Sequence, residues 1–269
     1  MRKEGYCAYG AARTSEALQA LQAAMSAFAG DDLRTVENAL DAAHRLQTCL
    51  TLFRACYPKT RVALWKRRLR RLIRLLNAQR DLLRLIEWAR TLSPPQEHTA
   101  GVRRALLRLT QRTEAQRMKL QHAQRQWLDS RAPNEISGLS RRWTESFADE
   151  PCDGDYAQRQ WTLFVREQQT ALEDDSAQSL EVRCGRLRAL IEGSELLQPL
   201  LACPPEPEWR TQYETLERRR WQEHAKRLLE ELLEREVILR LWTEGHLRGF
   251  ARLRRGWEWL IQQIGYTHI

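Results

Sequence analysis

Apolar residues recur along this chain at spacings of three and four, which is the period of amphipathic α-helices. The clearest helix is expected from about Thr60 to Leu92. Its apolar side chains fall on one face by helical geometry: Leu69, Leu72, Ile73, Leu76 and Leu83. No segment alternates apolar and polar residues as a half-buried strand does. The pattern therefore predicts an all-α fold of roughly eight or nine helices.

Capping residues and helix breakers predict where helices begin and end. Asp31 or Asp32 is expected to cap a helix that runs to about Tyr57. Ser93 is expected to cap a later helix, with Pro94 at its first position. Further breaks are expected at residues 133–138 and 149–155.

A weak internal repeat suggests two similar helical units. Leu46–Leu50 precedes a break marked by proline and an arginine-rich helix, and Arg186–Leu190 precedes a similar break and another basic helix. This arrangement predicts two helical bundles packed side by side in one domain over residues 1–269, with approximate halves 14–148 and 155–263.

The excess of positive charge indicates that this helical protein attracts anions. Lys and Arg total 44 against 35 Asp and Glu, which gives a formal charge of +9, and most of the cations are arginines. Guanidinium groups suit phosphate and carboxylate oxygens. The stretch from Arg61 to Arg84 contains only Asp81 as an acid, so it is the best candidate for anion binding. By contrast, acids flank the basic run near Arg218 and are expected to cancel much of its charge.

Within that stretch the arginines divide into two groups. Arg67, Arg70, Arg71 and Arg74 lie roughly opposite the leucines, whereas Arg80 falls among them. A charge on an apolar face is costly unless it is paired or faces a wet cavity. Arg80 is therefore expected to extend to the edge of the apolar face, to pair with an inward-facing acid, or to line an internal anion-binding channel.

Motifs for catalysis, metals and nucleotides are missing from the sequence. The histidines show no HxxxH or HExxH spacing, and no GxxxxGK[ST], GxGxxG or GxSxG motif occurs. We therefore expect no catalytic residue, no metal site and no cofactor. The six cysteines form no CxxC pair and are expected to be reduced thiols of a cytoplasmic protein. No apolar stretch of about 18 residues suggests a membrane span.

The ten tryptophans are mostly expected in the core, because they lie beside leucine and isoleucine in helical segments. This expectation includes Trp242. Trp257 and Trp259 are two residues apart and point in different directions on a helix, so one of them is a candidate anchor for a protein interface.

Three segments together resemble CHAD domains, the conserved-histidine α-helical family. Val36–Gln47, continuing to Phe53, is similar to the opening motif of that family, and Leu69–Leu82, with its Arg80-Asp81 pair, is similar to the second segment. Leu180–Glu192 resembles the repeat of the opening motif. The resemblance implies two four-helix units around a basic central cavity that binds inorganic polyphosphate without catalysis.

The positions that match the family motifs define a predicted binding site. The positions that differ from those motifs suggest alternative functions. The resemblance carries over to His44, Arg45, Arg80, Arg186 and Arg188. With the basic stretch, the predicted polyanion-binding residues are His44, Arg45, Arg67, Arg70, Arg71, Arg74, Arg80, Arg186 and Arg188.

The departures remove several expected donors and add acid. Glu37 stands at the signature histidine, Leu40 and Gln47 replace arginines, and Glu181 and Gly185 alter the repeat. An adaptor that kept the helical frame and binds an acidic or disordered protein partner is therefore the second hypothesis. Non-specific binding of nucleic acid is the third.

Overall fold

The computed structural model describes residues 3–27, 30–173, 180–201, 207–244 and 249–265. Within these ranges the chain forms nine α-helices and one short 3-10 helix, and no strand. The helices are α1 (Glu4–Ser26), α2 (Leu33–Leu52), η1 (Arg54–Cys56), α3 (Lys59–Thr91), α4 (Thr99–Leu128), α5 (Arg131–Ser146), α6 (Gly154–Glu173), α7 (Leu180–Leu201), α8 (Pro207–Glu244) and α9 (Phe250–Gly265). The predicted all-α fold is confirmed.

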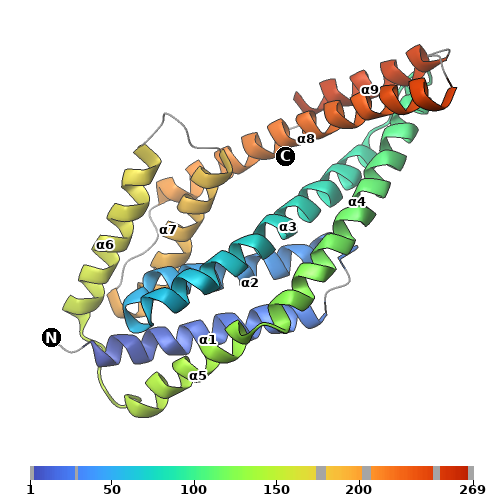
Figure 1. The fold of residues 1–269 in the computed structure, drawn as a ribbon. Helices are drawn as coiled ribbons and strands as arrows, with labels where there is room; N and C mark the ends of the chain where they lie inside the picture. The colour runs from blue at the N-terminus through green and yellow to red at the C-terminus, as the bar shows by residue number, and fades with distance from the viewer. Residues whose placement is uncertain (1–2, 28–29, 174–179, 202–206, 245–248, 266–269) are drawn as a thin grey trace.

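The long helices give the molecule an elongated shape (Figure 1). Helices α3 and α4 run side by side, and at their far end they pack against α8 and α9. At the other end α1 packs against α2 and α5, and α7 packs against α2, α6 and α8. As a result, α2 and α3 face α7 and α8 across the middle of the molecule.

Two hydrophobic clusters hold these helices together. The first is centred on Tyr6, Phe53 and Trp65 and gathers α1, α2, α5, α6, α7 and the first half of α3. The second joins the distal parts of α3 and α8 to α4 and α9, with Trp88 edge-on to Trp221 at 6.0 Å between ring centres. Each cluster draws residues from both predicted halves. The division into two four-helix bundles stays a prediction.

Helix boundaries follow the capping rules in part. Asp32 caps α2 as predicted, because its carboxylate accepts a 2.9 Å hydrogen bond from the Thr35 amide. The prediction for Ser93 was wrong, since α4 begins only at Thr99. The predicted break at Pro133 was also wrong, because that residue lies in the first turn of α5, where a backbone N–H has no helical partner to lose.

The cysteine prediction was wrong for two residues. Cys7 and Cys56 form a disulfide with an S–S distance of 2.09 Å, which ties the start of α1 to η1. They are 49 residues apart in sequence, but the packing of α1 on α2 and η1 brings their Cα atoms to 5.3 Å. Cys49, Cys152 and Cys184 are free thiols. Reduced cysteines therefore no longer support a cytoplasmic location, which stays a prediction.

The tryptophans largely fill the core, with one exception. Trp242, expected in the core, is 86% exposed near the end of α8. Trp257 is fully buried and donates its indole N–H to the Leu229 carbonyl at 3.1 Å. Trp259 is half-buried and stacks on His98. The expected interface anchor is therefore neither Trp257 nor Trp259.

Among the described residues, no helix has both the length and the apolar character needed to cross a membrane.

Candidate anion-binding site

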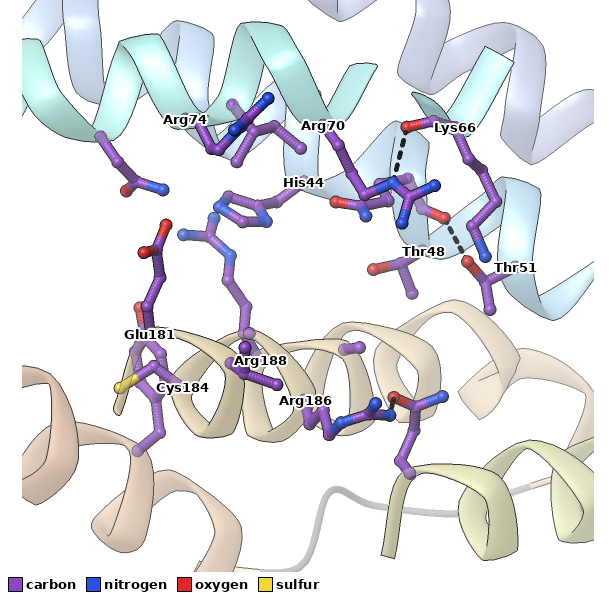
Figure 2. Close-up of a pocket in the computed structure, with 18 of the residues that line it drawn as sticks. His44, Thr48, Thr51, Lys66, Arg70, Arg74, Glu181, Cys184, Arg186 and Arg188 are labelled. Carbon is purple, nitrogen blue, oxygen red and sulfur yellow. Dashed lines mark hydrogen bonds between the residues drawn. The ribbon is translucent and has the colours of Figure 1, made fainter. Parts of the chain in front are cut away.

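A cavity of about 720 Å³ opens between α2 and α3 on one side and α7 and α8 on the other (Figure 2). Its lining is strongly cationic. Eight Lys and Arg side chains contribute to it: Lys66, Arg67, Arg70, Arg74, Arg80, Arg186, Arg188 and Arg220. They are opposed by three lining acids, Glu167, Glu181 and Glu217. The excess of positive charge makes this cavity the natural place for an anion.

One wall of the cavity is a row of arginines on α3. We call Arg67, Arg70 and Arg74 the α3 row. The buried leucines of α3 fix the helix against the first core, which turns these three exposed side chains toward the cavity. In Figure 2 the Arg70 side chain reaches into the space below α3. Within the described part of the chain, none of the three forms an ion pair, so their charge is available to a ligand.

The opposite wall, on α7, is partly neutralised. Arg188 contacts Asp41 at 2.6 Å and Glu192 at 2.8 Å. Thr48 donates a 2.6 Å hydrogen bond to the other oxygen of Glu192. Burial raises the pKa of the Glu192 carboxyl, although Arg188 and Thr48 favour its charged form. Among the described residues, in contrast, Arg186 forms a hydrogen bond only with the neutral Gln168 amide oxygen, at 3.4 Å.

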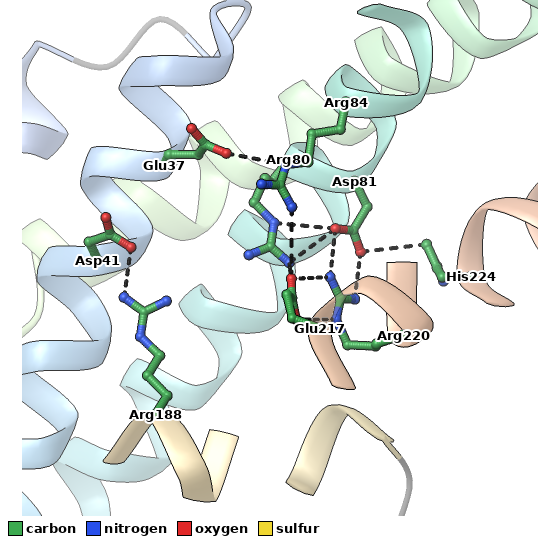
Figure 3. A network of polar contacts seen from close by, with 9 residues as sticks. All are labelled: Glu37, Asp41, Arg80, Asp81, Arg84, Arg188, Glu217, Arg220 and His224. Carbon is green, nitrogen blue, oxygen red and sulfur yellow. Dashed lines mark hydrogen bonds and ion pairs between the residues drawn. The ribbon is translucent and has the colours of Figure 1, made fainter. Parts of the chain in front are cut away.

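The far end of the cavity is closed by a network of four charged residues (Figure 3). Arg80 contacts Asp81 at 3.1 Å and Glu217 at 2.7 Å, and Arg220 contacts each of the same two acids at 2.8 Å. Desolvation opposes the charged form of the Asp81 carboxyl, but hydrogen bonds from Arg220 and the charge of Arg80 outweigh it and lower the pKa. Arg80 therefore pairs with inward-facing acids, as one of its interpretations predicted, and it also lines the cavity. Anion binding by Arg80 stays a prediction.

His44 lies between the two walls. It points from α2 into the cavity, close to Arg188 in Figure 2. Burial lowers its pKa well below the usual range, and the charges of Arg188 and Arg80 lower it further. The imidazole is therefore neutral near pH 7.

Of the nine predicted site residues, the structure brings seven together in the cavity and leaves two outside. Arg45 lies on the surface, 3.8 Å from Glu195. Arg71 lies on another flank of α3, in a smaller pocket. Sequence reasoning missed Lys66 and Arg220 as lining residues. The run of arginines at residues 218–220 could have indicated Arg220, but we expect the neighbouring acids to cancel much of the positive charge of that run.

The two acids that replace family positions occupy different places. Glu37 pairs with Arg84 at 3.3 Å and does not line the cavity (Figure 3). Glu181 lines the cavity, is exposed, and forms no ion pair within the described residues. Only Glu181 is thus positioned to repel a bound anion.

Metal chemistry finds no support in the described residues, where no group of three or more His, Cys, Asp or Glu is placed to hold an ion. The cavity therefore combines hydrogen-bond donors with positive charge and has the chemistry of a binding site for phosphate-like anions.

Comparison with known proteins adds one finding. A profile of the CHAD domain matches residues 12–257, a range that includes every residue lining the cavity. Comparisons with curated proteins and with solved structures find no match.

Proposed function

The chain belongs to the CHAD domain family, and from that premise we propose that it binds inorganic polyphosphate in the cavity without catalysing a reaction. The observation that carries the proposal is the α3 row, whose three guanidinium groups line the cavity and form no ion pair within the described residues. Arg67 and Arg74 are seven residues apart, so the row extends over about 10 Å of helix. A linear chain of phosphates needs such a row of rigidly placed donors and no readout of bases.

The cavity also explains why affinity is expected to depend on salt. Each phosphate that contacts an arginine releases counterions, so binding weakens as salt rises. Arg186, whose hydrogen-bond partner within the described part of the chain is a neutral amide, adds a donor from the opposite wall. His44 and Arg188 contribute to the walls near the α3 row. Arg80 and Arg220 are already paired and are proposed to position the wall rather than to bind ligand.

Binding to a protein partner is a second candidate, and one surface favours it. Ile238, Leu241 and Trp242 are exposed and share one face near the end of α8, because they are three and four residues apart. Exposed tryptophan is typical of interface anchors. Under this hypothesis, an adaptor would bind its partner through this face or through an acidic segment placed on the arginines.

Nucleic-acid binding, the third candidate, lacks a stacking platform. Single-strand binders stack bases on exposed aromatic side chains. All ten tryptophans lie within the described residues, and only Trp242 is exposed, near the far end of α8 from the cavity. Among the described lining residues, Tyr213 and His44 are the rings present, and Tyr213 is partly buried, so the cavity offers little surface on which bases could stack.

The test is a calorimetric titration with long-chain polyphosphate at low salt. Wild-type protein is expected to bind, with affinity that falls as salt rises. Replacing Arg70 and Arg74 by Ser is expected to weaken binding by about 100-fold, since a hydrogen bond to a charged group contributes about 1.5–3 kcal/mol. The matched control replaces Arg90 and Arg103, exposed arginines outside the cavity lining that form no ion pair within the described part of the chain.

Two results would contradict the proposal. One is no binding by the wild type at low salt. The other is an equal loss of affinity in the Arg70/Arg74 and Arg90/Arg103 variants, because net charge alone would then explain the binding. A stoichiometric protein partner recovered by pull-down, together with no polyphosphate binding, would favour the adaptor.

A further inference from the structure

A second, smaller pocket lies on another flank of α3, where the end of α4 meets the start of α5. Its volume is about 250 Å³. We call it the outer pocket, and its walls are Arg68, Arg71, Leu72, Ala123, Gln126, Trp127 and Ser130. Arg68 and Arg71 are exposed, and neither forms an ion pair within the described residues. The space could hold several water molecules or a small oxyanion, since one water occupies about 30 Å³ of liquid.

The walls of the outer pocket carry more hydrogen-bond donors than acceptors. Trp127 is only 3% exposed, and its buried indole N–H has no hydrogen-bond partner among the residues that the structure describes. The Ser130 hydroxyl is already engaged, because it donates to the Trp127 carbonyl at 2.7 Å and accepts from the Ala132 amide. No carboxylate belongs to the walls. The two exposed guanidinium groups, with no carboxylate among the wall residues, therefore favour a ligand that brings its own acceptor oxygens and negative charge.

Helical geometry places the arginines of the outer pocket beside those that line the cavity. Successive residues of an α-helix turn by about 100°. Arg71 is four residues from Arg67, so the two lie next to each other around α3 although they line different pockets. Arg68 and Arg71 thus extend the α3 row over the solvent-facing side of the helix. The arginines of the two pockets are therefore neighbours on α3. The sequence from Arg67 to Arg74 contains no acidic residue.

We propose that the outer pocket is a second oxyanion subsite, which takes phosphoryl groups of a polyphosphate chain that leaves the cavity over α3. The identity of the ligand at this subsite rests on the proposed function. The hydrogen-bond donors of the subsite are different residues from those of the cavity. It makes binding depend on chain length, because only a chain that spans α3 reaches both pockets. A chain held at two points gains affinity through effective concentration.

Tripolyphosphate and long-chain polyphosphate separate the two pockets in a titration. Replacing Arg68 and Arg71 by Ser is expected to leave the affinity for tripolyphosphate within about twofold, because the cavity is intact. The same variant should lower the affinity for long chains by about tenfold relative to the Arg90/Arg103 control. Equal losses in the two variants for long chains would overturn the second subsite, since they would reflect net charge only.

A second measurement keeps the two proposals distinguishable. In the Arg70/Arg74 variant, the indole ¹H–¹⁵N signal of Trp127 is followed by NMR during titration with tripolyphosphate. A saturable shift that R68S/R71S abolishes is the expected result. An unmoved signal overturns the outer pocket even if the wild-type cavity binds. A shift of Trp127 in a protein whose cavity binds nothing would overturn the proposed function and leave the subsite standing.

Discussion

The two ends of the cavity carry the same residue type in different electrostatic states. At one end the α3 row forms no ion pairs within the described residues. At the other, Arg80 and Arg220 are held by Asp81 and Glu217, and all four side chains are at least 84% buried. An exposed arginine without a partner can exchange water for a phosphate, whereas a buried, paired arginine must first lose its carboxylate.

This difference shows that the number of arginines in a cavity lining overestimates the number that are available to a ligand. The cavity lining has eight cations, but the acids around it already satisfy three of them, Arg80, Arg188 and Arg220. These three connect helices: Arg80 and Arg220 join α3 to α8, and Arg188 joins α7 to α2. We infer that they hold the walls apart at a fixed spacing while the α3 row meets the ligand.

Removing the charge of Asp81 should have the largest effect, and it should act on stability. Asp81→Asn leaves Arg80 and Arg220 buried with one acid between them. Breaking a buried ion pair on one side costs about 3–5 kcal/mol, so the free energy of unfolding should fall by about 3 kcal/mol. Denaturant unfolding measures it, with Glu87→Gln as control, an exposed acid on the same helix. A change as small as that of the control would show that the network is not a structural element.

Removing the charge of Glu181 should raise affinity by about threefold to tenfold. Its carboxylate lines the cavity and forms no ion pair within the described residues, so it opposes a bound anion. Glu181→Gln therefore strengthens polyphosphate binding in a titration at low salt. Glu37→Gln is the matched control and should bring no gain, because Glu37 pairs with Arg84 away from the lining. If both substitutions raised affinity alike, the gain would come from net charge.

A smaller effect is expected from His44, and it concerns pH. Burial, Arg188 and Arg80 hold its pKa well below the usual range in the empty cavity. Bound phosphates oppose those charges and raise the pKa, so binding takes up a proton. Affinity therefore increases as pH falls through the interval between the raised pKa of the bound state and the lowered pKa of the free state. The gain should be less than about tenfold. His44→Gln should remove it, while the titration of the ligand's own end groups persists. An unchanged pH profile in that variant would exclude proton uptake by His44.

The sequence was most informative about α3. Helical periodicity placed Leu69, Leu72, Ile73 and Leu76 in the core and Arg80 among them, and the structure confirms these positions. It could not supply Arg80's partner Glu217, which lies 137 residues further along the chain. Such a contact depends on how α8 crosses α3, which local periodicity does not encode.

The same limit explains why the sequence did not separate the residues that line the cavity from those that lie outside it. Arg70 and Arg71 are neighbours in sequence with the same propensities, yet one lines the cavity and the other the outer pocket. Helical geometry turns the two side chains about 100° apart, but the positions of α4, α5 and α7 around α3 decide which of them faces the cavity. The Cys7–Cys56 disulfide was missed for a related reason, because it depends on how η1 returns to the start of α1.

The most direct test of the account is to follow the arginine side chains by NMR while long-chain polyphosphate is added. The side-chain Nε–H signals of the α3 row are predicted to shift and saturate at one equivalent of binding sites. Those of Arg80 and Arg220 are predicted to stay close to their positions in the free protein, because their carboxylate partners are retained. Shifts of Arg80 and Arg220 with an unmoved α3 row would contradict the account, since the ligand would then be displacing the buried acids.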